Sequence, residues 1–98
     1  MTLVFSPEVE GEIAAAANYY AIESRDLKER FLAEVESTLR RIEEFPNAWP
    51  PATLGMRRCL CSKFPFAIIY RPVNGGIKIY AVAHQKRRPG YWKARLRG

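Results

Sequence analysis

The residues of this chain that are best suited to chemistry gather near its C-terminus. The only histidine, His84, is followed within eleven residues by five Lys or Arg side chains and by Tyr91 and Trp92. Guanidinium groups bind phosphate, aromatic rings stack on bases, and a His or Tyr side chain can move a proton. Residues 81–95 therefore predict a site for a phosphate-rich ligand. If the chain cleaves RNA, the candidate catalytic residues are His84, Arg87 and Tyr91.

The same segment has a simpler interpretation, in which it is a solvated basic tail. Tyr91 and Trp92 would then hold the tail against the rest of the protein through their apolar rings. His84 would then be a structural or surface residue, a role that fits a histidine as well as a catalytic role does. Both interpretations use the same residues, so the sequence leaves the choice open.

Charge is distributed very unevenly along the chain. All ten acidic residues lie in the first 50 positions, which also hold five bases and so carry a net charge of −5. The last 48 positions hold eleven bases and no acid, a net charge of +11. This asymmetry predicts a positive surface that meets nucleic acid or an acidic protein. The residues expected to contact such a partner are Arg57, Arg58, Lys63, Lys86, Arg88, Trp92 and Arg95.

Several kinds of site are disfavoured by the residues that the chain lacks. No Asp or Glu follows Glu44, and one histidine cannot form a multi-histidine metal site. Cys59 and Cys61 are two residues apart, so a strand would place both on one face, as reduced core residues and not as a disulfide or zinc pair. We therefore expect no metal and no cofactor. Any catalysis would be a metal-free reaction in which cations position a ribose 2′-OH against its phosphate.

Length and composition predict one globular domain over residues 1–98. Apolar residues make up 48% of the chain and aromatic residues 12%, which is enough for one small core. No apolar run approaches the roughly 20 residues that cross a bilayer. The first residues have no basic region followed by a long apolar stretch, so we expect a cytoplasmic protein without membrane contact.

Two helices are predicted in the first half. Ser6-Pro7-Glu8 is typical of a helix start, with a capping serine, a proline in the first turn and an early acid. Ser24 begins a second helix, and Pro46 ends it. The short link between the two amphipathic helices predicts an antiparallel hairpin. The apolar stripe of the second helix is Leu27, Phe31, Val35, Leu39 and Ile42.

The second half changes to the period-two pattern of strands after a proline-rich loop at residues 46–55. A short first strand at residues 3–5 and three later strands are predicted, the later ones at residues 57–62, 66–71 and 77–84. The fold class is α+β with the order β-α-α-β-β-β, an antiparallel sheet with the helix hairpin on one face and a basic C-terminal tail. The first strand joins the edge of the sheet or inserts beside it. The tail, residues 85–98, has a short helix after Pro89-Gly90.

Alternation along the last strand predicts which side chains share a face of the sheet. Ile77, Ile79, Ala81 and Ala83 would lie on one face, and Lys78, Tyr80, Val82 and His84 on the other. With the hairpin covering one face, the other face would be open. Apolar groups there, such as Ile69 or Val82 beside Tyr80, would be free to be covered by a partner.

Four segments carry a resemblance to a known family: AANYY, RFLAEVESTLRRIEEFPNAWPP, RRCLCSKFPFAIIYRP and IKIYAVAHQKRRPGYWKAR. They resemble the RelE/ParE toxin superfamily of bacterial type II toxin–antitoxin systems, of the plasmid stabilisation type, from residue 3 to about residue 95. The resemblance implies the element order given above. It also implies an acidic antitoxin, encoded by an adjacent gene, whose C-terminal segment wraps the toxin and covers the open sheet face.

The superfamily divides by target. RelE-like members cut mRNA on the ribosome with cations on the sheet and a C-terminal Arg and Tyr, whereas ParE-like members lack that set and poison DNA gyrase. In this sequence Lys86 or Arg87 corresponds best to the C-terminal Arg, Tyr91 to the Tyr, and His84 to a histidine that some ribonucleases use. Ala67, however, stands where the ribonucleases tend to have an Arg on the third strand.

A direct alignment on the segment FAIIY also places Trp92, and not Tyr91, at the terminal Tyr. The ribonuclease set is therefore partial, which favours a ParE-like growth inhibitor acting on DNA gyrase. The first alternative is a RelE-like, ribosome-dependent mRNA endonuclease using His84, Arg87, Arg88 and Tyr91. An alternative of another class is a non-toxic nucleic-acid-binding domain.

Overall fold

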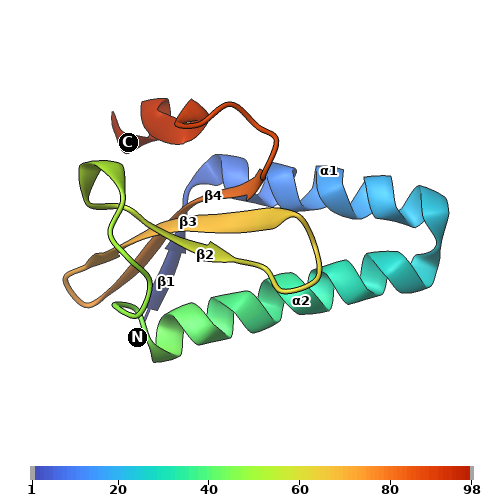
Figure 1. The fold of residues 1–98 in the computed structure, drawn as a ribbon, viewed down its shortest axis with the longest axis horizontal. Helices are drawn as coiled ribbons and strands as arrows, with labels where there is room; N and C mark the ends of the chain where they lie inside the picture. Colours follow the sequence, from blue (N-terminus) through green and yellow to red (C-terminus); the bar gives the residue numbers. More distant parts are fainter. Residues whose placement is uncertain (1, 98) are drawn as a thin grey trace.

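A four-stranded sheet has a helical hairpin packed on one face and the C-terminal tail on the other (Figure 1). The computed structural model describes residues 2–97, and their order of elements is the predicted one. No helix of these residues is long and apolar enough to cross a membrane. The elements are β1 (Thr2–Phe5), α1 (Pro7–Glu23), α2 (Arg25–Glu44), η1 (Thr53–Gly55), β2 (Arg57–Leu60), β3 (Phe66–Val73), β4 (Gly76–His84) and η2 (Tyr91–Arg97).

The two helices begin where the sequence predicts, but the two serines act differently. Ser24 caps α2, because its hydroxyl oxygen accepts a hydrogen bond from the backbone N–H of Leu27 at 3.0 Å. Ser6 occupies the corresponding position before α1, yet its hydroxyl donates to the carboxylate of Glu8 at 2.6 Å and caps no backbone group. This hydrogen bond lowers the pKa of Glu8 below its usual value.

The sheet has the order β1-β4-β3-β2 and is mixed. Strands β2, β3 and β4 form the predicted antiparallel meander, whereas β1 joins the outer edge of β4 in parallel. Pairing between β1 and β4 runs from Thr2 opposite Gly76 to Phe5 opposite Ile79. The rest of β4, from Tyr80 onward, therefore extends past the last residue of β1.

The predicted alternation along β4 is wrong beyond Ile79. Ile69 of β3 lies opposite Ala81 and Tyr70 lies opposite Ile79, so Tyr80 is an extra residue at a β-bulge. Residues of β4 after the bulge therefore lie on the opposite face of the sheet from the one predicted. Val82 consequently packs with Ile79 in the core beneath the helices, and Ala81 packs with Tyr80 on the opposite face.

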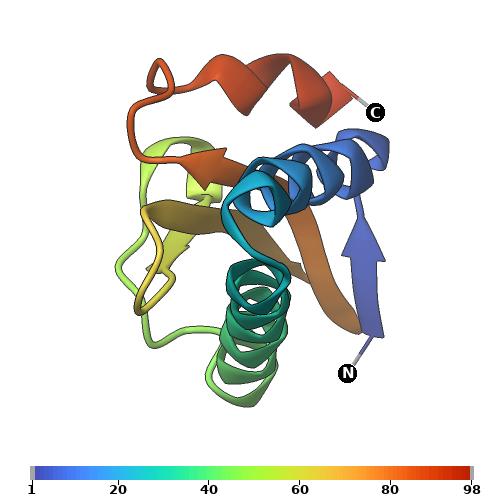
Figure 2. The same cartoon turned by 90° about the vertical axis from the view of Figure 1, so that its right-hand side faces the viewer.

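The prediction of an open second face is also wrong. Trp92 of η2, which is 8% exposed, packs on that face with Met56, Ile69 and Tyr80. Figure 2 shows the tail lying across the sheet beside α1. The apolar groups expected to await a partner are thus already covered, Ile69 by the chain's own tail and Val82 by the helices, because burying them within the chain removes apolar area from water.

The larger core lies between the hairpin and the sheet. Aromatic rings of Tyr20, Phe31 and Phe66 pack there with centroids 5.2 to 6.4 Å apart. Cys59 and Cys61 are free thiols buried in this core, as predicted from their spacing. Burial raises the pKa of Cys59 to about 11, so its thiol is protonated at neutral pH and serves as a small apolar residue.

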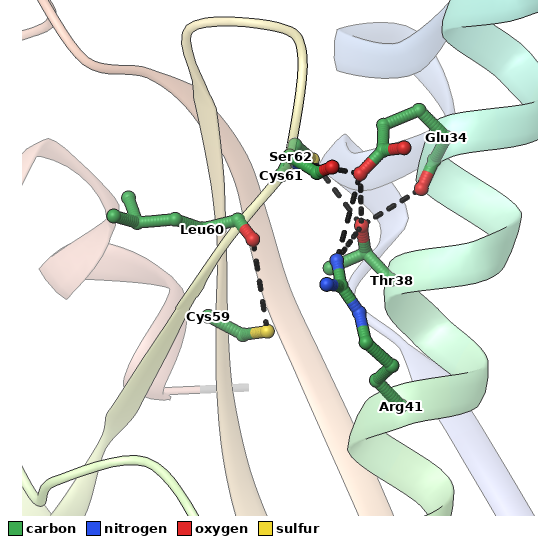
Figure 3. Close-up of polar contacts among 7 residues, drawn as sticks. All are labelled: Glu34, Thr38, Arg41, Cys59, Leu60, Cys61 and Ser62. Atoms are coloured by element: carbon green, nitrogen blue, oxygen red, sulfur yellow. Dashed lines mark hydrogen bonds and ion pairs between the residues drawn. The ribbon is translucent and has the colours of Figure 1, made fainter.

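A polar cluster ties α2 to the end of β2 (Figure 3). The carboxylate of Glu34 accepts a hydrogen bond from the backbone N–H of Ser62 at 2.5 Å. Arg41 donates to the hydroxyl of Thr38 at 2.9 Å, and that hydroxyl donates to the carbonyl of Glu34 at 2.7 Å. These contacts turn the chain toward α2, which explains why β2 ends at Leu60 and not at residue 62 as predicted.

Replacement of Glu34 by Ala should lower the free energy of unfolding by about 1.5 kcal/mol, because a charged acceptor is lost from the turn after β2. Glu36→Ala is the matched control on the same helix. Glu36 pairs with Arg40 on the exposed surface, so its loss should change the free energy by less than about 0.5 kcal/mol. Urea unfolding of the two variants measures the difference, and equal effects would contradict a role for Glu34 in fixing the turn.

Candidate functional site

A basic groove of about 310 Å³ lies between the second face of the sheet and the tail. Its floor includes Ala67 and Ile69 of β3 and Ala83 of β4. Among the described residues that line it, none is acidic. The cationic and aromatic residues that define the basic groove are Arg57, Arg58, His84, Arg87, Arg88, Tyr91, Trp92 and Lys93.

Two separate parts of the chain supply these cations. Strand β2 places Arg58 opposite Ile69, on the face covered by the tail, and the side chain is exposed. Its neighbour Arg57 is half-buried and donates a hydrogen bond to the carbonyl of Trp49, which fixes the proline-rich loop. The link between β4 and η2 supplies Arg87 and Arg88 across the groove. Cations approaching from two elements can hold an anionic group between them.

His84 is the last residue of β4 and anchors the start of the tail. Its Nδ1 accepts a hydrogen bond from the backbone N–H of Lys86 at 3.0 Å. The imidazole also packs edge-on against the ring of Phe66, with centroids 5.1 Å apart. In the neutral ring this leaves the proton on Nε2. The contacts of His84 therefore shape the turn that brings Arg87 and Arg88 to the groove.

Tyr91 is held by α1. Its hydroxyl donates a hydrogen bond to the carboxylate of Glu12 at 2.5 Å. Burial and this hydrogen bond raise the pKa of Tyr91 to about 12, so the hydroxyl keeps its proton at neutral pH. The guanidinium carbon of Arg87 lies 3.8 Å from the centroid of the tyrosine ring, a cation–π contact. Tyr91 thus orients Arg87 in the groove.

Glu12 is the central support of this arrangement. Besides Tyr91, its carboxylate accepts hydrogen bonds from Arg95 at 3.0 and 2.9 Å and from the backbone N–H of Val82 at 3.0 Å. Arg95 donates in addition to the carbonyl of Tyr80 at 2.9 Å. The side chains of Glu12 and Arg95 are each 13% exposed. The hydrogen bond to Glu12 raises the pKa of the Arg95 guanidinium above its usual value.

The position of the pair follows from the topology of the sheet. Strand β1 reaches only Ile79, so the carbonyl of Tyr80 and the N–H of Val82 lie on an edge of β4 that β1 does not reach. A backbone group left unpaired at a buried edge costs about as much as a lost hydrogen bond. Arg95 and Glu12 supply the two bonds that a longer β1 would make. The tail is therefore fixed to the sheet edge and to α1 at once.

The structure brings together seven of the ten predicted site residues and separates three. The basic groove includes Arg57, Arg58, His84, Arg87, Arg88, Tyr91 and Trp92. Lys63 lies elsewhere, in the turn after β2 beside α2. Lys86 is exposed and does not line the groove, and Arg95 belongs to the ion pair with Glu12. The packing of Trp92 and the ion pair of Arg95 hold the tail in place.

Two residues of the site were not among the named candidates. Lys93 lines the groove, and the sequence indicated it only as one more base of the tail. Glu12 had a weaker signal: it is an acid on a helix rich in alanine, in a chain whose last 48 residues contain no acid to balance their bases. The site presents guanidinium groups that can bind an anion, while His84 and Tyr91 both take part in hydrogen bonds within the protein.

Comparisons with known proteins agree with one another. A family model described as "ParE toxin of type II toxin-antitoxin system, parDE" matches residues 3–89. Toxin ParE2 of Mycobacterium tuberculosis, in strains CDC 1551 / Oshkosh and ATCC 25618 / H37Rv, is 30% identical over 91 residues, which are 92% of this chain and 87% of the relative. A solved structure described as "Chromosomal ParDE TA system from P. aeruginosa" shares the fold, with a TM-score of 0.66 and 17% identity over 86% of this chain and 95% of that one.

A double-mutant cycle on Glu12 and Arg95 tests whether their pair fixes the tail. Either single change to Ala should lower the free energy of unfolding by about 3 kcal/mol, because it leaves the partner charge uncompensated and largely buried. The coupling energy of the cycle should be about 2 kcal/mol. The exposed pair of Asp26 and Arg30 is the control, with a coupling below about 0.5 kcal/mol. Similar couplings for the two pairs would contradict the assignment.

The hydrogen bond of Tyr91 predicts a dependence of stability on alkaline pH. Because folding raises the pKa of this hydroxyl from about 10 to about 12, its contribution is fully present below pH 10 and is lost as the pH rises toward 12. Tyr91→Phe should lower the unfolding free energy at pH 8 by about 1.5 kcal/mol. The difference in unfolding free energy between wild type and variant should become smaller from pH 10 to pH 12. Tyr19→Phe, at a tyrosine 68% exposed, should show no such gap.

Proposed function

This chain belongs to the ParE toxin family of type II toxin–antitoxin systems, and we propose from that premise that it inhibits growth by binding DNA gyrase. The observation that carries the proposal is the basic groove. Arg58 of β2 and Arg87 and Arg88 of the link before η2 surround a groove that no described acidic residue lines. Such a surface suits an acidic segment of a large protein target, because clustered cations attract opposite charge and fix the orientation of its approach.

The hydrogen bonds of Tyr91 and His84, the two side chains that could transfer a proton, favour binding over catalysis. The hydroxyl of Tyr91 is bonded to the carboxylate of Glu12, and its pKa of about 12 makes it a poor base at neutral pH. The Nδ1 of His84 accepts a backbone N–H. Position 67, at the floor of the groove, is an alanine, which brings no charge to a phosphate. These features support an inhibitor that works by occupying its target.

Membership of a type II toxin–antitoxin family implies an antitoxin partner. We expect this partner to be acidic and to be encoded by an adjacent gene. The net charge of +11 over the last 48 residues supports an acidic partner, because complementary charge speeds association and disfavours wrong partners.

A second candidate function is cleavage of mRNA on the ribosome. The observation in its favour is that His84, Arg87 and Tyr91 line one groove. Attack by a ribose 2′-OH requires charge neutralisation and a proton acceptor within hydrogen-bond reach. If this function were correct, His84→Ala or Tyr91→Phe would abolish growth inhibition while leaving antitoxin binding intact.

The proposal predicts how charge reversal alters inhibition of purified gyrase. Arg58→Glu and Arg88→Glu should each raise the concentration needed to inhibit DNA supercoiling by about tenfold or more, which corresponds to losing about 1.4 kcal/mol of binding. Arg25→Glu is the matched control: Arg25 is exposed at the far end of the helical hairpin, so its reversal makes the same change in net charge. Its inhibition should stay within about threefold of wild type.

Two further variants separate binding from catalysis in the same assay. His84→Ala and Tyr91→Phe should keep inhibition within about tenfold of wild type, because they disturb the tail without removing the groove's cations. Two results together would overturn the proposal. The wild-type protein would fail to inhibit gyrase, and it would cleave ribosome-bound mRNA in a way that depends on His84 or Tyr91.

A further inference from the structure

The turn before β2, residues 53–56, holds a leucine in a conformation that leucines rarely adopt. Leu54 has φ 61° and ψ 32°, in the left-handed region, and Gly55 after it has φ 73°. The N–H of Met56 donates a hydrogen bond to the carbonyl of Thr53 at 3.2 Å, which closes the turn. Positive φ at both central residues is the pattern of a type I′ turn. Among residues 2–97, Leu54 is the one residue other than glycine with positive φ.

The residue at the tip of this turn does not suit its conformation. The first central position of a type I′ turn favours Asn, Asp or Gly, because the Cβ of other residues crowds the backbone there. A leucine side chain forms no hydrogen bond that could offset this crowding. Burial offsets little of it, since Leu54 is 56% exposed. Residues held in such conformations are found chiefly at functional sites.

The chain on both sides of the tip keeps the turn in this conformation. The N–H of Ala52 donates a hydrogen bond to the carbonyl of Met56 at 2.6 Å, and Pro51 pairs with Arg57 in a short antiparallel bridge. The side chain of Met56 is buried in the cluster that includes Trp92. The tip of the turn is therefore presented on a firmly anchored base.

The turn lies at the rim of the basic groove. Thr53 and Met56, on the two sides of the tip, both line the groove, and Arg58 of β2 lines it as well. In Figure 1 and Figure 2 the turn lies next to the tail, whose first residues bring Arg88 to the groove. Leu54 is thus an exposed apolar side chain beside a cluster of cations.

An apolar side chain beside fixed cations indicates what kind of surface it meets. Protein–protein interfaces combine an apolar centre with arginines, and covering an exposed leucine removes apolar area from water. Contacts to nucleic acid are mostly hydrogen bonds to phosphate and sugar, which a leucine cannot form. The combination therefore favours a protein surface that has an apolar pocket with acidic side chains beside it.

We propose that Leu54 is the apolar anchor of the contact with gyrase. Its side chain enters an apolar pocket of the target, while Arg58 and Arg88 bind acidic side chains next to that pocket. The inference rests on the proposed function for the identity of the target. Because the turn is already fixed in the free protein, Leu54 contributes to affinity with little loss of conformational freedom on binding.

Replacement of Leu54 by Asn separates a role in binding from a role in the fold. Asn adopts the left-handed conformation readily, so Leu54→Asn should melt about 3 °C above the wild type in differential scanning calorimetry. The variant lacks the apolar side chain, so the concentration that halves DNA supercoiling by purified gyrase should rise about tenfold. Leu54→Met keeps an apolar side chain of similar volume and should inhibit within about threefold of the wild type.

The matched control is Ile22→Asn. Ile22 is 84% exposed near the end of α1, where the backbone is helical. Its replacement removes an exposed apolar side chain that is not at the basic groove and relieves no backbone strain. The melting temperature should therefore not rise, and inhibition of gyrase should stay within about threefold of the wild type.

Equal inhibition by the wild type and Leu54→Asn would overturn the inference and leave the proposed function in place. A melting temperature of Leu54→Asn below that of the wild type would also overturn it, because the leucine would then be stabilising the fold. So would a loss of inhibition matched by an equal loss of affinity for linear DNA without gyrase, since the contact would then be with nucleic acid. Absence of inhibition by the wild type would refute the proposed function, and this inference with it.

Discussion

The hydrogen-bonded ion pair between Glu12 and Arg95 is the interaction on which the rest of the site depends. Strand β1 is too short to cover the whole outer edge of β4, and the pair satisfies the carbonyl of Tyr80 and the N–H of Val82 that lie past its end. A largely buried pair is stabilising only when its remaining hydrogen-bonding positions are filled, and here the backbone and the hydroxyl of Tyr91 fill them. The contact that completes the sheet edge also joins the tail to α1.

The basic groove follows from the position of the tail. With η2 held at the edge of β4, Trp92 covers the second face of the sheet, and the link before η2 brings its bases beside those of β2. The same link also borders a second groove, which runs along α1. Arg87 stands between the two grooves, stacked on a tyrosine that cannot ionise at neutral pH. The guanidinium of Arg87 therefore borders both grooves.

Local patterns were enough to predict the element order, because helix caps, helical spacing and period-two alternation depend only on residues close in sequence. They did not predict the bulge at Tyr80, a residue that packs in one cluster with Trp92 of a later element. Nor could they pair Glu12 with Arg95, which are 83 positions apart. Charge alone predicted a basic surface, but only the fold separates the bases that line the groove from Lys63, which the turn after β2 carries to α2.

The central claim is that this chain acts on DNA gyrase and not on mRNA. The most direct measurement is pulse-labelling of cells after tightly controlled induction, with thymidine and methionine incorporation followed in parallel. The account predicts that thymidine incorporation falls first, with filamentation from DNA damage, while methionine incorporation continues. A prompt fall in methionine incorporation with thymidine incorporation spared would contradict the account, and it would return His84 and Tyr91 to the role of catalytic candidates.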